Sequence, residues 1–333
     1  MTATVSKTVQ ITRYGGAEVL ELVERAVGQP AAGEILLRHH AIGLNFIDVY
    51  QRSGLYALPL PLALGMEGAG VVEAVGDGVT HLQKGDRVAY ASNPPGSYCE
   101  RRVMPATHVC KLPDHISFET GAAMMLKGLT VQYLLKQCIP VEGLQAGDHV
   151  LFHAAAGGVG LIACQWAKAL GAKLIGTVGS AEKAQRALQA GAWQVINYRD
   201  ENIAERVKAI TGGKKLPVVY DSVGKDTWEA SLDCLQRRGL MVSFGNSSGP
   251  VTGVNLGILN QKGSLFVTRP SLNGYITTYD ELKEASHELF SLIASGIIKV
   301  DVAASQKYPL KEARRAHEIL ESRATQGSSL LIP

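Results

Sequence analysis

The spacing of hydrophobic positions divides the chain into two regions with different predicted secondary structure. Over the first ~125 residues, short apolar runs such as EILLRHHAIGL, AGVVEAV and DRVAYA are separated by glycine and proline turns, which predicts mostly β-strands. Helical periodicity is weak there. From about residue 117, the segment SFETGAAMMLKGLTVQYLLKQC has apolar residues at helical spacing, with Ser117 and Glu119 near its start. A β-rich region followed by a helix is therefore expected.

Segments with strand and helix patterns alternate in the second region. The predicted strands are HVLF (149–152), KLIGTV (173–178), WQVINY, PVVYDS (217–222), LMVSF (240–244) and GSLFVT (263–268). Helical periodicity marks VGLIACQWAKAL, which ends at Gly171, and EKAQRALQAGA, which ends at Gly191, as well as NIAERVKAIT, YDELKEASHELFSLIASGII and LKEARRAHEILESR. Because such alternation produces a parallel sheet with helices on both faces, we expect a doubly wound α/β domain with a six-stranded sheet.

Composition and charge narrow the class of protein further. The 333 residues are 46% hydrophobic and 19% charged, enough for about two domains with a sizeable core. A net charge of +3 does not favour nucleic acid as the main partner. The most apolar stretch, LYALPLPLALGMEGAGVVEAVG, is interrupted by Pro59, Pro61 and Glu67, so we expect no membrane-spanning segment. The N-terminal residues lack the apolar run of a signal peptide. The five cysteines form no CxxC pair. We expect a cytoplasmic protein with reduced thiols and no membrane partner.

The segment HAAAGGVG, which begins at His153, has the form of a dinucleotide-binding turn whose first glycine is replaced. Such a turn needs small residues for the tight turn, for approach of the backbone to the pyrophosphate, and for close packing of the helix. These places are Ala155, Gly157 and Gly160, and alanine can take the first if its φ stays negative. The helix start at Gly158–Val159 then offers N–H groups to the pyrophosphate. His153 is expected to be a packed strand residue.

The end of the next predicted strand bears on the choice of cofactor. NAD enzymes usually carry an acid there, which accepts a hydrogen bond from the ribose 2′-hydroxyl. Here KLIGTVGSAEK continues with Gly179 and Ser180, has Lys183 within one turn, and has Glu182 as the one acid nearby. A lysine and a hydroxyl suit a 2′-phosphate, which an acid would repel. The sequence favours NADP(H), with Tyr198 beside the same pocket, although Lys183 could instead be only a solvated surface residue.

Several motifs together resemble one family. They are AIGLNFIDVYQRSGLY (41–56), LGMEGAGVVEAVG (64–76), GDRVAY (85–90), LKGLTVQYLL (126–135), HAAAGGVG, VVYDSVG (218–224) and SFGNSSG (243–249). On these segments the chain resembles, nearly end to end, the zinc-free, zeta-crystallin-like quinone oxidoreductases of the medium-chain dehydrogenase/reductase superfamily. The resemblance implies a GroES-like β domain at 1–127, completed by 271–333, and a Rossmann NADPH-binding domain at 128–270.

The chain departs from the zinc alcohol dehydrogenases of this superfamily at the positions of their metal ligands. The histidine of their Gly-His-Glu motif is replaced by Met66, and their first catalytic cysteine is replaced by Asn45. Their structural zinc lobe needs four closely spaced cysteines, which the sequence lacks. Because a thioether and an amide do not replace imidazole and thiolate at a tetrahedral zinc site, we expect no metal.

The resemblance also implies where the cofactor binds. The Asn-x-x-Asp-x-Tyr loop is implied to lie beside the nicotinamide, which makes Asn45, Asp48 and Tyr50 candidate catalytic residues. The positions implied to bind the cofactor are Phe46, Thr130, Tyr133, Gly157, Gly158, Val159, Gly179, Ser180, Lys183, Tyr198, Ser222, Phe244, Gly245, Phe266, Val267, Thr268 and Arg323. Some have plain structural alternatives: Phe266 and Val267 could be strand core, and Asp48 could only cap a turn.

The chemistry implied is reduction of a quinone by NADPH, in which the cofactor carries the hydride and the protein positions the partners. The site must provide a dry slot and one or two hydrogen-bond donors for the quinone oxygen. Tyr50 and Tyr56 are candidate donors because a phenol can donate a hydrogen bond and relay a proton. Water could protonate the product instead. Arg52 and Arg269 could shape the mouth of the slot.

Two other functions stay open at this point. NADPH-linked reduction of the C=C bond of an alkenal or enone needs the same hydride and the same zinc-free pocket. A crystallin-like or single-stranded RNA-binding protein is disfavoured by the near-neutral charge and the 6% aromatic content. The segment GSLFVT would be an exposed edge strand unless another chain covers it, and the resemblance implies a homodimer joined through that edge. The sequence alone would also permit a monomer.

Overall fold

The chain folds into two compact units, in a computed structural model that describes residues 4–333 except 92, 140–142, 301, 323–324 and 326. Unit 1 comprises Met1–Leu129, Ile276–Ser295 and Val300–Pro333. Unit 2 comprises Thr130–Tyr275 and Gly296–Lys299. Unit 1 is thus assembled from segments far apart in the sequence, whereas unit 2 is nearly continuous.

Unit 2 is built on a parallel sheet. Its strands are β9 (His149–Phe152), β10 (Lys173–Val178), β11 (Gln194–Asn197), β12 (Leu216–Asp221), β13 (Leu235–Ser243) and β14 (Phe266–Thr268). In the described part of the chain they lie in the order β11-β10-β9-β12-β13-β14, and all neighbours are parallel. Numbered along the chain, this is the order 3-2-1-4-5-6 of the Rossmann fold. The prediction of a doubly wound six-stranded sheet is confirmed.

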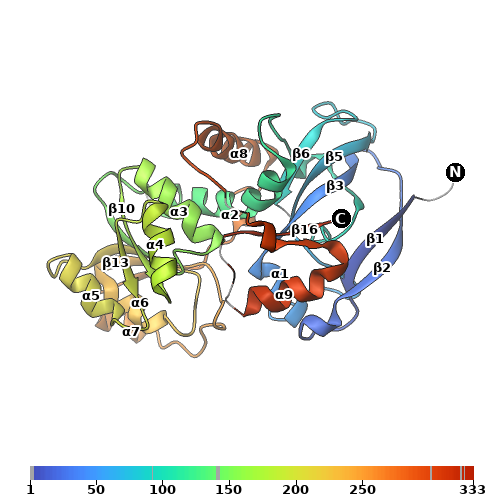
Figure 1. Cartoon of the computed structure of the whole chain (residues 1–333). Coiled ribbons are helices and arrows are strands. Elements are labelled where there is room, and N and C mark those ends of the chain that lie inside the picture. The colour runs from blue at the N-terminus through green and yellow to red at the C-terminus, as the bar shows by residue number, and fades with distance from the viewer. Residues whose placement is uncertain (1–3, 92, 140–142, 301, 323–324, 326) are drawn as a thin grey trace. The chain divides into compact units, whose positions relative to one another are not determined.

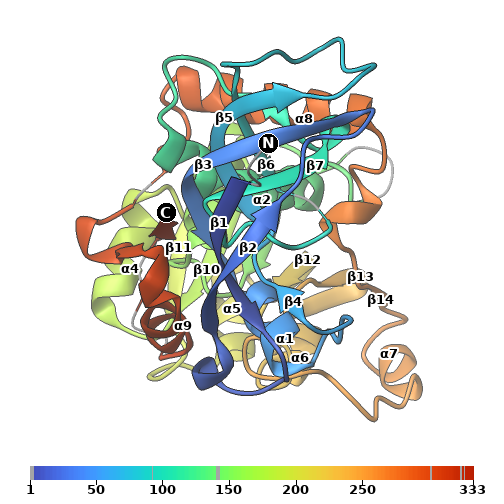
Figure 2. The same cartoon turned by 90° about the vertical axis from the view of Figure 1, so that its right-hand side faces the viewer.

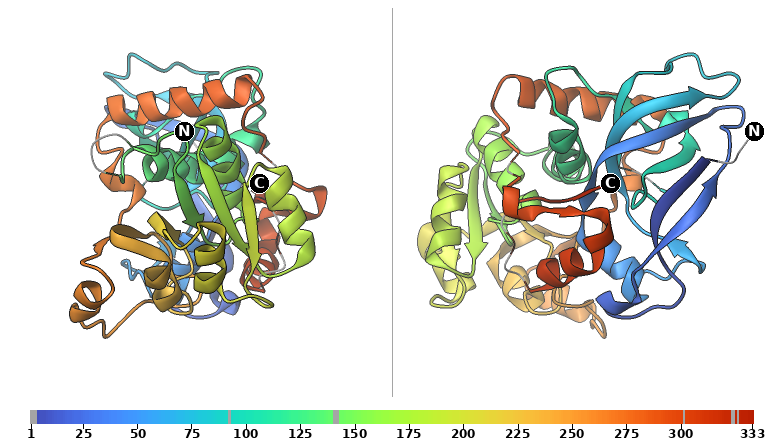
Figure 3. Two further views of the ribbon diagram at one scale, coloured as in Figure 1. Left: turned by 90° about the vertical axis from the view of Figure 1, so that its left-hand side faces the viewer. Right: turned by 45° about the vertical axis from the view of Figure 1, so that its right-hand side comes forward.

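Helices cover both faces of this sheet. They are α3 (Gly158–Ala169), α4 (Ala181–Gln189), α5 (Ile203–Ile210), α6 (Trp228–Cys234) and α7 (Gly257–Gln261). Helix α3 packs beside α4, and α5 packs beside α6; the left panel of Figure 3 shows the strands with helices to either side. The glycines predicted to end α3 and α4 do so, since Gly171 and Gly191 follow them with φ of +75° and +109°, where a side chain would be strained.

Unit 1 contains a large, mainly antiparallel sheet and a smaller one. The large sheet contains β3 (Glu34–Leu44), β5 (Glu67–Val75), β6 (Arg87–Ala91), β7 (Arg101–Pro105), β8 (Cys110–Lys111), β15 (Lys307–Pro309) and β16 (Ser329–Ile332). The small sheet contains β1 (Thr4–Ile11), β2 (Glu21–Val27) and β4 (Leu62–Ala63), and Figure 2 shows β1 and β2 as a long twisted pair. Ser329 of β16 lies opposite Leu44 of β3, so a C-terminal segment continues the N-terminal sheet.

The remaining helices include one that the hydrophobic pattern did not predict. They are α1 (Phe46–Ser53), α2 (Phe118–Lys136), α8 (Tyr279–Ala294) and α9 (Ala313–Glu321), all labelled in Figure 1. Helix α1 begins after Asn45, whose backbone N–H donates to Asp48 Oδ2 (2.9 Å), and it ends at Gly54 with φ +83°. The helix follows β3 with only Asn45 between them, so its residues continue the apolar pattern of the strand, but its N-cap signal is present. In the described residues, no helix is both long and apolar enough to cross a bilayer.

Candidate functional site

The glycine turn joins β9 to α3 at the carboxyl edge of the parallel sheet. Ala154 is its left-handed residue, with φ +56°, whereas Ala155 keeps a negative φ and is fully buried. A Cβ at Gly160 would lie 2.4 Å from the carbonyl oxygen of Ala154, so only glycine allows this close packing. The N–H groups of the first turn of a helix have no acceptor within the helix. The turn therefore fits the pyrophosphate of a dinucleotide.

The two alanines of this turn should respond oppositely to replacement by glycine. Ala154→Gly removes left-handed strain of about 1 kcal/mol, and the extra freedom of the unfolded chain offsets part of that gain. Ala155→Gly relieves no strain and removes a buried methyl group, so it should lower the free energy of unfolding by about 1 kcal/mol. Urea unfolding should place Ala154→Gly at or above wild type and Ala155→Gly below it; the reverse order would contradict this account.

A chain of buried hydrogen bonds supports the glycine turn between β9 and α3. His153 Nδ1 lies 3.0 Å from Thr177 Oγ1, and Nε2 lies 2.9 Å from Ser231 Oγ. The Ser231 hydroxyl in turn donates to Asp221 Oδ2 at 2.7 Å. Thr177 Oγ1 also accepts from the N–H of Ala154 (3.3 Å), the strained residue. His153 is thus a packed residue, as expected, and burial lowers its pKa.

Four predicted cofactor residues lie together at the carboxyl end of β10. Ser180 caps α4, since its Oγ accepts from the N–H of Lys183 at 3.3 Å. Tyr198 lies against Gly179, where an added Cβ would come within 2.5 Å of Tyr198 Oη. Lys183 is half-buried, and Glu182, the acid of the first turn of α4, is exposed. This corner combines a helix N-terminus, hydroxyls and a lysine, which suits a phosphate.

Three further predicted residues meet where β12 and β13 end. The N–H of Phe244 donates to the carbonyl oxygen of Asp221 (2.8 Å), and the Phe244 ring lies 5.6 Å from that of Phe152. A Cβ at Gly245 would lie 2.4 Å from the carbonyl oxygen of Ser222, so glycine is needed for this approach. These carboxyl ends share the sheet edge at which α/β proteins bind their ligands.

The other predicted cofactor residues of unit 2 lie on α2 and β14. Thr130 and Tyr133 are buried on α2, and the Tyr133 ring stacks on Tyr275 at 4.5 Å. Phe266 and Val267 are 55% and 39% exposed on the edge strand β14, so the alternative that they are strand core is wrong. Thr268 follows on β14 and pairs with β13. Arg323 lies outside the described residues.

In unit 1, the loop and helix after β3 carry the predicted aromatic donors. The rings of Tyr50 and Tyr56 meet edge-to-face with 5.2 Å between centroids. The N–H of Tyr56 donates to the carbonyl oxygen of Tyr50 (3.0 Å). Phe46 adds a third ring, 6.2 Å from that of Tyr50. Tyr50 is buried while Tyr56 is 36% exposed, so the pair runs from the interior of the unit to its surface.

Arg52 does not lie at the mouth of a slot, and that prediction is wrong. Its side chain is 2% exposed and is bonded to both carboxylate oxygens of Glu321 on α9, at 2.9 and 2.8 Å. Its Nε–H donates to the carbonyl oxygen of Gly15. The physical reason is that a carboxylate 269 positions later neutralises the guanidinium, which lets it be buried. Arg269 is exposed and donates to the carbonyl oxygen of Ser243 (2.6 Å).

A buried hydrogen-bond chain leads from Arg52 to Asp48. Because a guanidinium only donates, His317 Nδ1 must accept from Arg52 Nη1 (3.0 Å), which leaves the proton of His317 on Nε2. Nε2 lies 3.1 Å from Tyr98 Oη, and the Tyr98 hydroxyl donates to Asp48 Oδ2 at 2.9 Å. In the described part of the chain, Asp48 Oδ1 has no partner. Burial raises the pKa of Asp48 to about 7 and lowers that of His317 to about 3.

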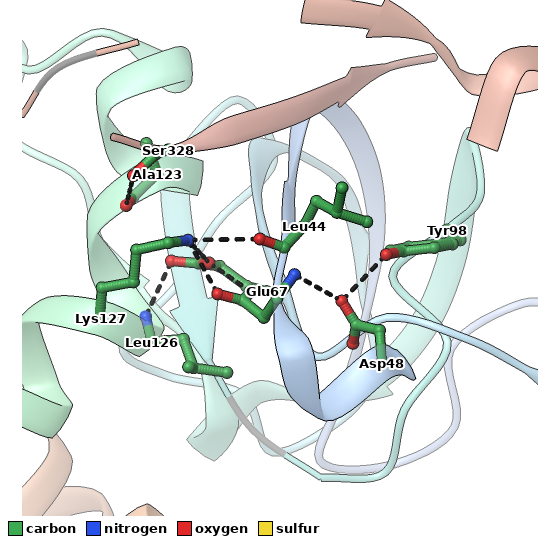
Figure 4. Close-up of polar contacts among 9 residues, drawn as sticks. Leu44, Asp48, Glu67, Tyr98, Ala123, Leu126, Lys127 and Ser328 are labelled. Carbon is green, nitrogen blue, oxygen red and sulfur yellow. Dashed lines mark hydrogen bonds and ion pairs between the residues drawn. The ribbon is translucent and has the colours of Figure 1, made fainter. Parts of the chain in front are cut away.

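A second buried cluster, drawn in Figure 4, was not anticipated from the sequence. Lys127 Nζ on α2 lies 2.8 Å from Asn45 Oδ1, 3.4 Å from Glu67 Oε2 and 3.5 Å from the carbonyl oxygen of Leu44. Asn45 Nδ2 donates to Glu67 Oε2 (2.8 Å), and the N–H of Leu126 donates to Glu67 Oε1 (2.8 Å). The lysine and glutamate side chains are 7% and 0% exposed. Both charges are therefore inside the protein and satisfied by one another and by Asn45.

Comparison with known proteins defines the class first. The model "Alcohol dehydrogenase GroES-like domain" matches residues 31–135, and the model "Zinc-binding dehydrogenase" matches residues 158–294. With the Rossmann sheet and the glycine turn, these matches place the chain in the medium-chain dehydrogenase/reductase superfamily.

Individual relatives then define the family. The chain is 70% identical to quinone oxidoreductase of Salmonella typhimurium over 98% of this chain and 99% of that protein. It is 43% identical to 2-haloacrylate reductase of a Burkholderia species, over 97% and 98% respectively. A solved structure of Escherichia coli quinone oxidoreductase complexed with NADPH matches with a TM-score of 0.96 and 67% identity, covering 98% and 100% of the two chains. The chain belongs to the quinone oxidoreductase family, which confirms the resemblance carried by its motifs.

The matching family model "Zinc-binding dehydrogenase" refers to a zinc ion, but the residues of this chain are not suited to bind one. In the described residues, no group of three or more His, Cys, Asp and Glu side chains could hold a metal ion. At the positions of the zinc ligands, the Asn45 amide bonds to Lys127 and Glu67, and the Met66 sulfur lies 3.5 Å from Gln51 Nε2. These groups are poor zinc ligands that are already engaged within the protein.

Proposed function

We propose that this protein is an NADPH-dependent quinone reductase that works without a bound metal. The observation that carries the proposal is the similarity, over nearly the whole chain, to a quinone oxidoreductase whose structure was solved with NADPH. The corner at the end of β10 supports the choice of phosphate-bearing cofactor, since it offers Lys183 and the hydroxyls of Ser180 and Tyr198 without an acid at the strand end.

The predicted site residues bind and orient the reactants. When bound, NADPH supplies a hydride from its nicotinamide ring. The N–H groups of Gly158 and Val159 hold the pyrophosphate at the start of α3, and Lys183 neutralises the 2′-phosphate. Tyr50 and Tyr56 donate hydrogen bonds to the quinone oxygen as negative charge develops on it.

Loss of the Tyr50 hydroxyl is expected to lower kcat for quinone reduction by about tenfold or more, because the transition state then lacks one donor. Tyr50→Phe keeps the ring that packs on Tyr56 and Phe46, so the fold and the NADPH KM should change little. Steady-state kinetics measures both, with Tyr308→Phe, another buried tyrosine of unit 1, as the matched control. An unchanged kcat would remove Tyr50 from the catalytic residues.

A second candidate function is reduction of an activated C=C bond. It is favoured by the 43% identity with 2-haloacrylate reductase over nearly the full length of both chains. This reaction needs the same hydride donor, and an acceptor with a conjugated carboxylate or carbonyl in place of a quinone.

The experiment that separates the two follows oxidation of NADPH at the nicotinamide absorbance, with a chelator present. Benzoquinone and phenanthrenequinone are offered in one arm, and 2-chloroacrylate and an alkenal in the other. Fast turnover of quinones that resists the chelator supports the proposed function. Turnover of only the C=C acceptors supports the second candidate, and activity lost to the chelator and restored by zinc overturns the metal-free part.

We also propose that the protein is a cytoplasmic homodimer. Phe266 and Val267 are exposed on β14, which is the edge strand of its sheet in the described residues. An exposed apolar edge strand is a place where a second copy can continue the sheet across a two-fold axis. Sedimentation equilibrium tests this, and a monomer at micromolar concentration would contradict it.

A further inference from the structure

The cluster of Lys127, Glu67 and Asn45 is built into the fold rather than formed by chance contacts. The three side chains come from α2, the start of β5 and the residue before α1, and all are buried. Room for the carboxylate exists because residue 43 is a glycine, where a Cβ would lie 2.2 Å from Glu67 Oε2. Such a closed arrangement of charges in the interior is costly unless all its members are bonded.

The bonds within the cluster give the ammonium a complete set of acceptors. An ammonium has three N–H donors, and Lys127 Nζ meets the Asn45 amide oxygen, the Glu67 carboxylate and the carbonyl oxygen of Leu44. The shortest of these contacts is the one to Asn45, at 2.8 Å. Lys127 is therefore bonded most closely to the amide, while Glu67 balances its charge.

The Lys127 ammonium and the Glu67 carboxylate allow the side-chain amide of Asn45 only one orientation. Its Oδ1 faces the ammonium and its Nδ2 faces the carboxylate, and its backbone N–H donates to Asp48. Rotating the amide by half a turn would set NH₂ against the ammonium and oxygen against the carboxylate, and both contacts would be repulsive. Asn45 is thus held at the start of the loop that we propose lies beside the nicotinamide.

Asn45 and Met66, the residue before Glu67, also occupy the positions that carry metal ligands in zinc dehydrogenases. We propose that the Lys127 ammonium occupies the site that holds the metal ion in zinc dehydrogenases. There it supplies the positive charge in place of the metal and positions the Asn45 amide for the reaction. Lys127 is on this account a positioning residue. The second part rests on the proposed function, whereas the first does not.

A kinetic test separates positioning from simple structural support. Lys127→Met/Glu67→Gln removes both charges while conserving side-chain size, so that no lone charge is left buried. The double variant is expected to keep its circular dichroism and its NADPH KM within about twofold, and to lose at least about tenfold in kcat. Lys84→Met, at an exposed position of unit 1, is the matched control. A double variant with wild-type kcat would overturn the positioning role. Wild-type protein without turnover of any acceptor would count against the proposed function instead.

A metal-binding test addresses the cation itself and needs no activity. Asn45→Cys/Met66→His restores the zinc-ligand types beside Glu67, and it is compared with the same protein also carrying Lys127→Met. Cobalt(II) is titrated into each, and the thiolate-to-metal absorption band is followed. Removal of the ammonium is expected to tighten cobalt binding at least about tenfold. Equal binding by the two proteins, or binding by neither, would overturn the proposal that Lys127 holds the place of a metal.

Discussion

Asp48→Asn is expected to stabilise the protein relative to wild type by an amount that grows between pH ~4 and ~7. Burial raises the pKa of Asp48 to about 7, whereas an unfolded aspartate has a pKa of about 3.9. In this window the folded state keeps a proton that the unfolded state has lost, so the wild-type free energy of unfolding falls as pH rises, by about 1.4 kcal/mol per pH unit. Asparagine has no such proton, and its amide oxygen can accept the bonds from Asn45 and Tyr98.

Buried histidines give wild type a slope of the opposite sign, and a difference measurement removes their contribution. His317 and His39 have pKa values lowered to about 3 by burial, so acidification below about 6.5 protonates them in the unfolded state and destabilises the fold. Both proteins carry these histidines. Urea unfolding between pH ~5 and ~8 should show the advantage of Asp48→Asn rising toward on the order of 4 kcal/mol and levelling above pH ~7. A difference that does not vary with pH would contradict the raised pKa.

Lys183→Ala is expected to raise the KM for NADPH by about 10- to 100-fold and to leave that for NADH nearly unchanged. A charge-assisted hydrogen bond to phosphate contributes about 1.5–3 kcal/mol, and 1.4 kcal/mol corresponds to a factor of ten. NADH has no 2′-phosphate, so it loses nothing at this position. Because Lys183 is half-buried, added salt should weaken the wild-type preference only in part.

The measurement is the KM for each cofactor in wild type, Lys183→Ala and Lys208→Ala. Lys208 is an exposed lysine on α5 and controls for the change in net charge. A parallel rise for NADPH and NADH in Lys183→Ala would show that the lysine supports the fold of the corner instead of recognising phosphate.

The sequence predicts the parallel sheet of unit 2 well because its strands are apolar and bounded by glycine. Strands β9 and β10 lie at the predicted residues. Strand β13 begins at Leu235, earlier than predicted, because Gln236, Arg237 and Arg238 are exposed strand residues with no apolar pattern. Helix α1 was missed because it follows β3 with only Asn45 between them and so continues an apolar strand pattern, although Asn45 and Asp48 carry its capping signal.

The parts of the candidate site formed by residues close in sequence could be predicted, whereas the parts formed by residues far apart in sequence could not. Gly179, Ser180 and Lys183 are neighbours in sequence, and the structure brings Tyr198 to them across a single strand–helix–strand step. The buried clusters of unit 1 depend on partners far apart, such as Arg52 with Glu321. Charged residues inside the apolar runs LGMEGAGVV and MMLKGLTV were a signal that Glu67 and Lys127 are buried. Nothing in the residue order indicated that they pair.

The pairing of β16 with β3 has a consequence for the order in which the protein takes shape during translation. When the ribosome has reached residue 299, every residue of unit 2 exists, but β15 and β16 have not been made. Unit 2 can therefore fold on the nascent chain while the large sheet of unit 1 still leaves Ile42–Leu44 of β3 without β16, the strand that pairs with them on one side. The backbone groups of these residues can pair with any extended strand, so the growing chain needs chaperone protection at this edge until β16 emerges.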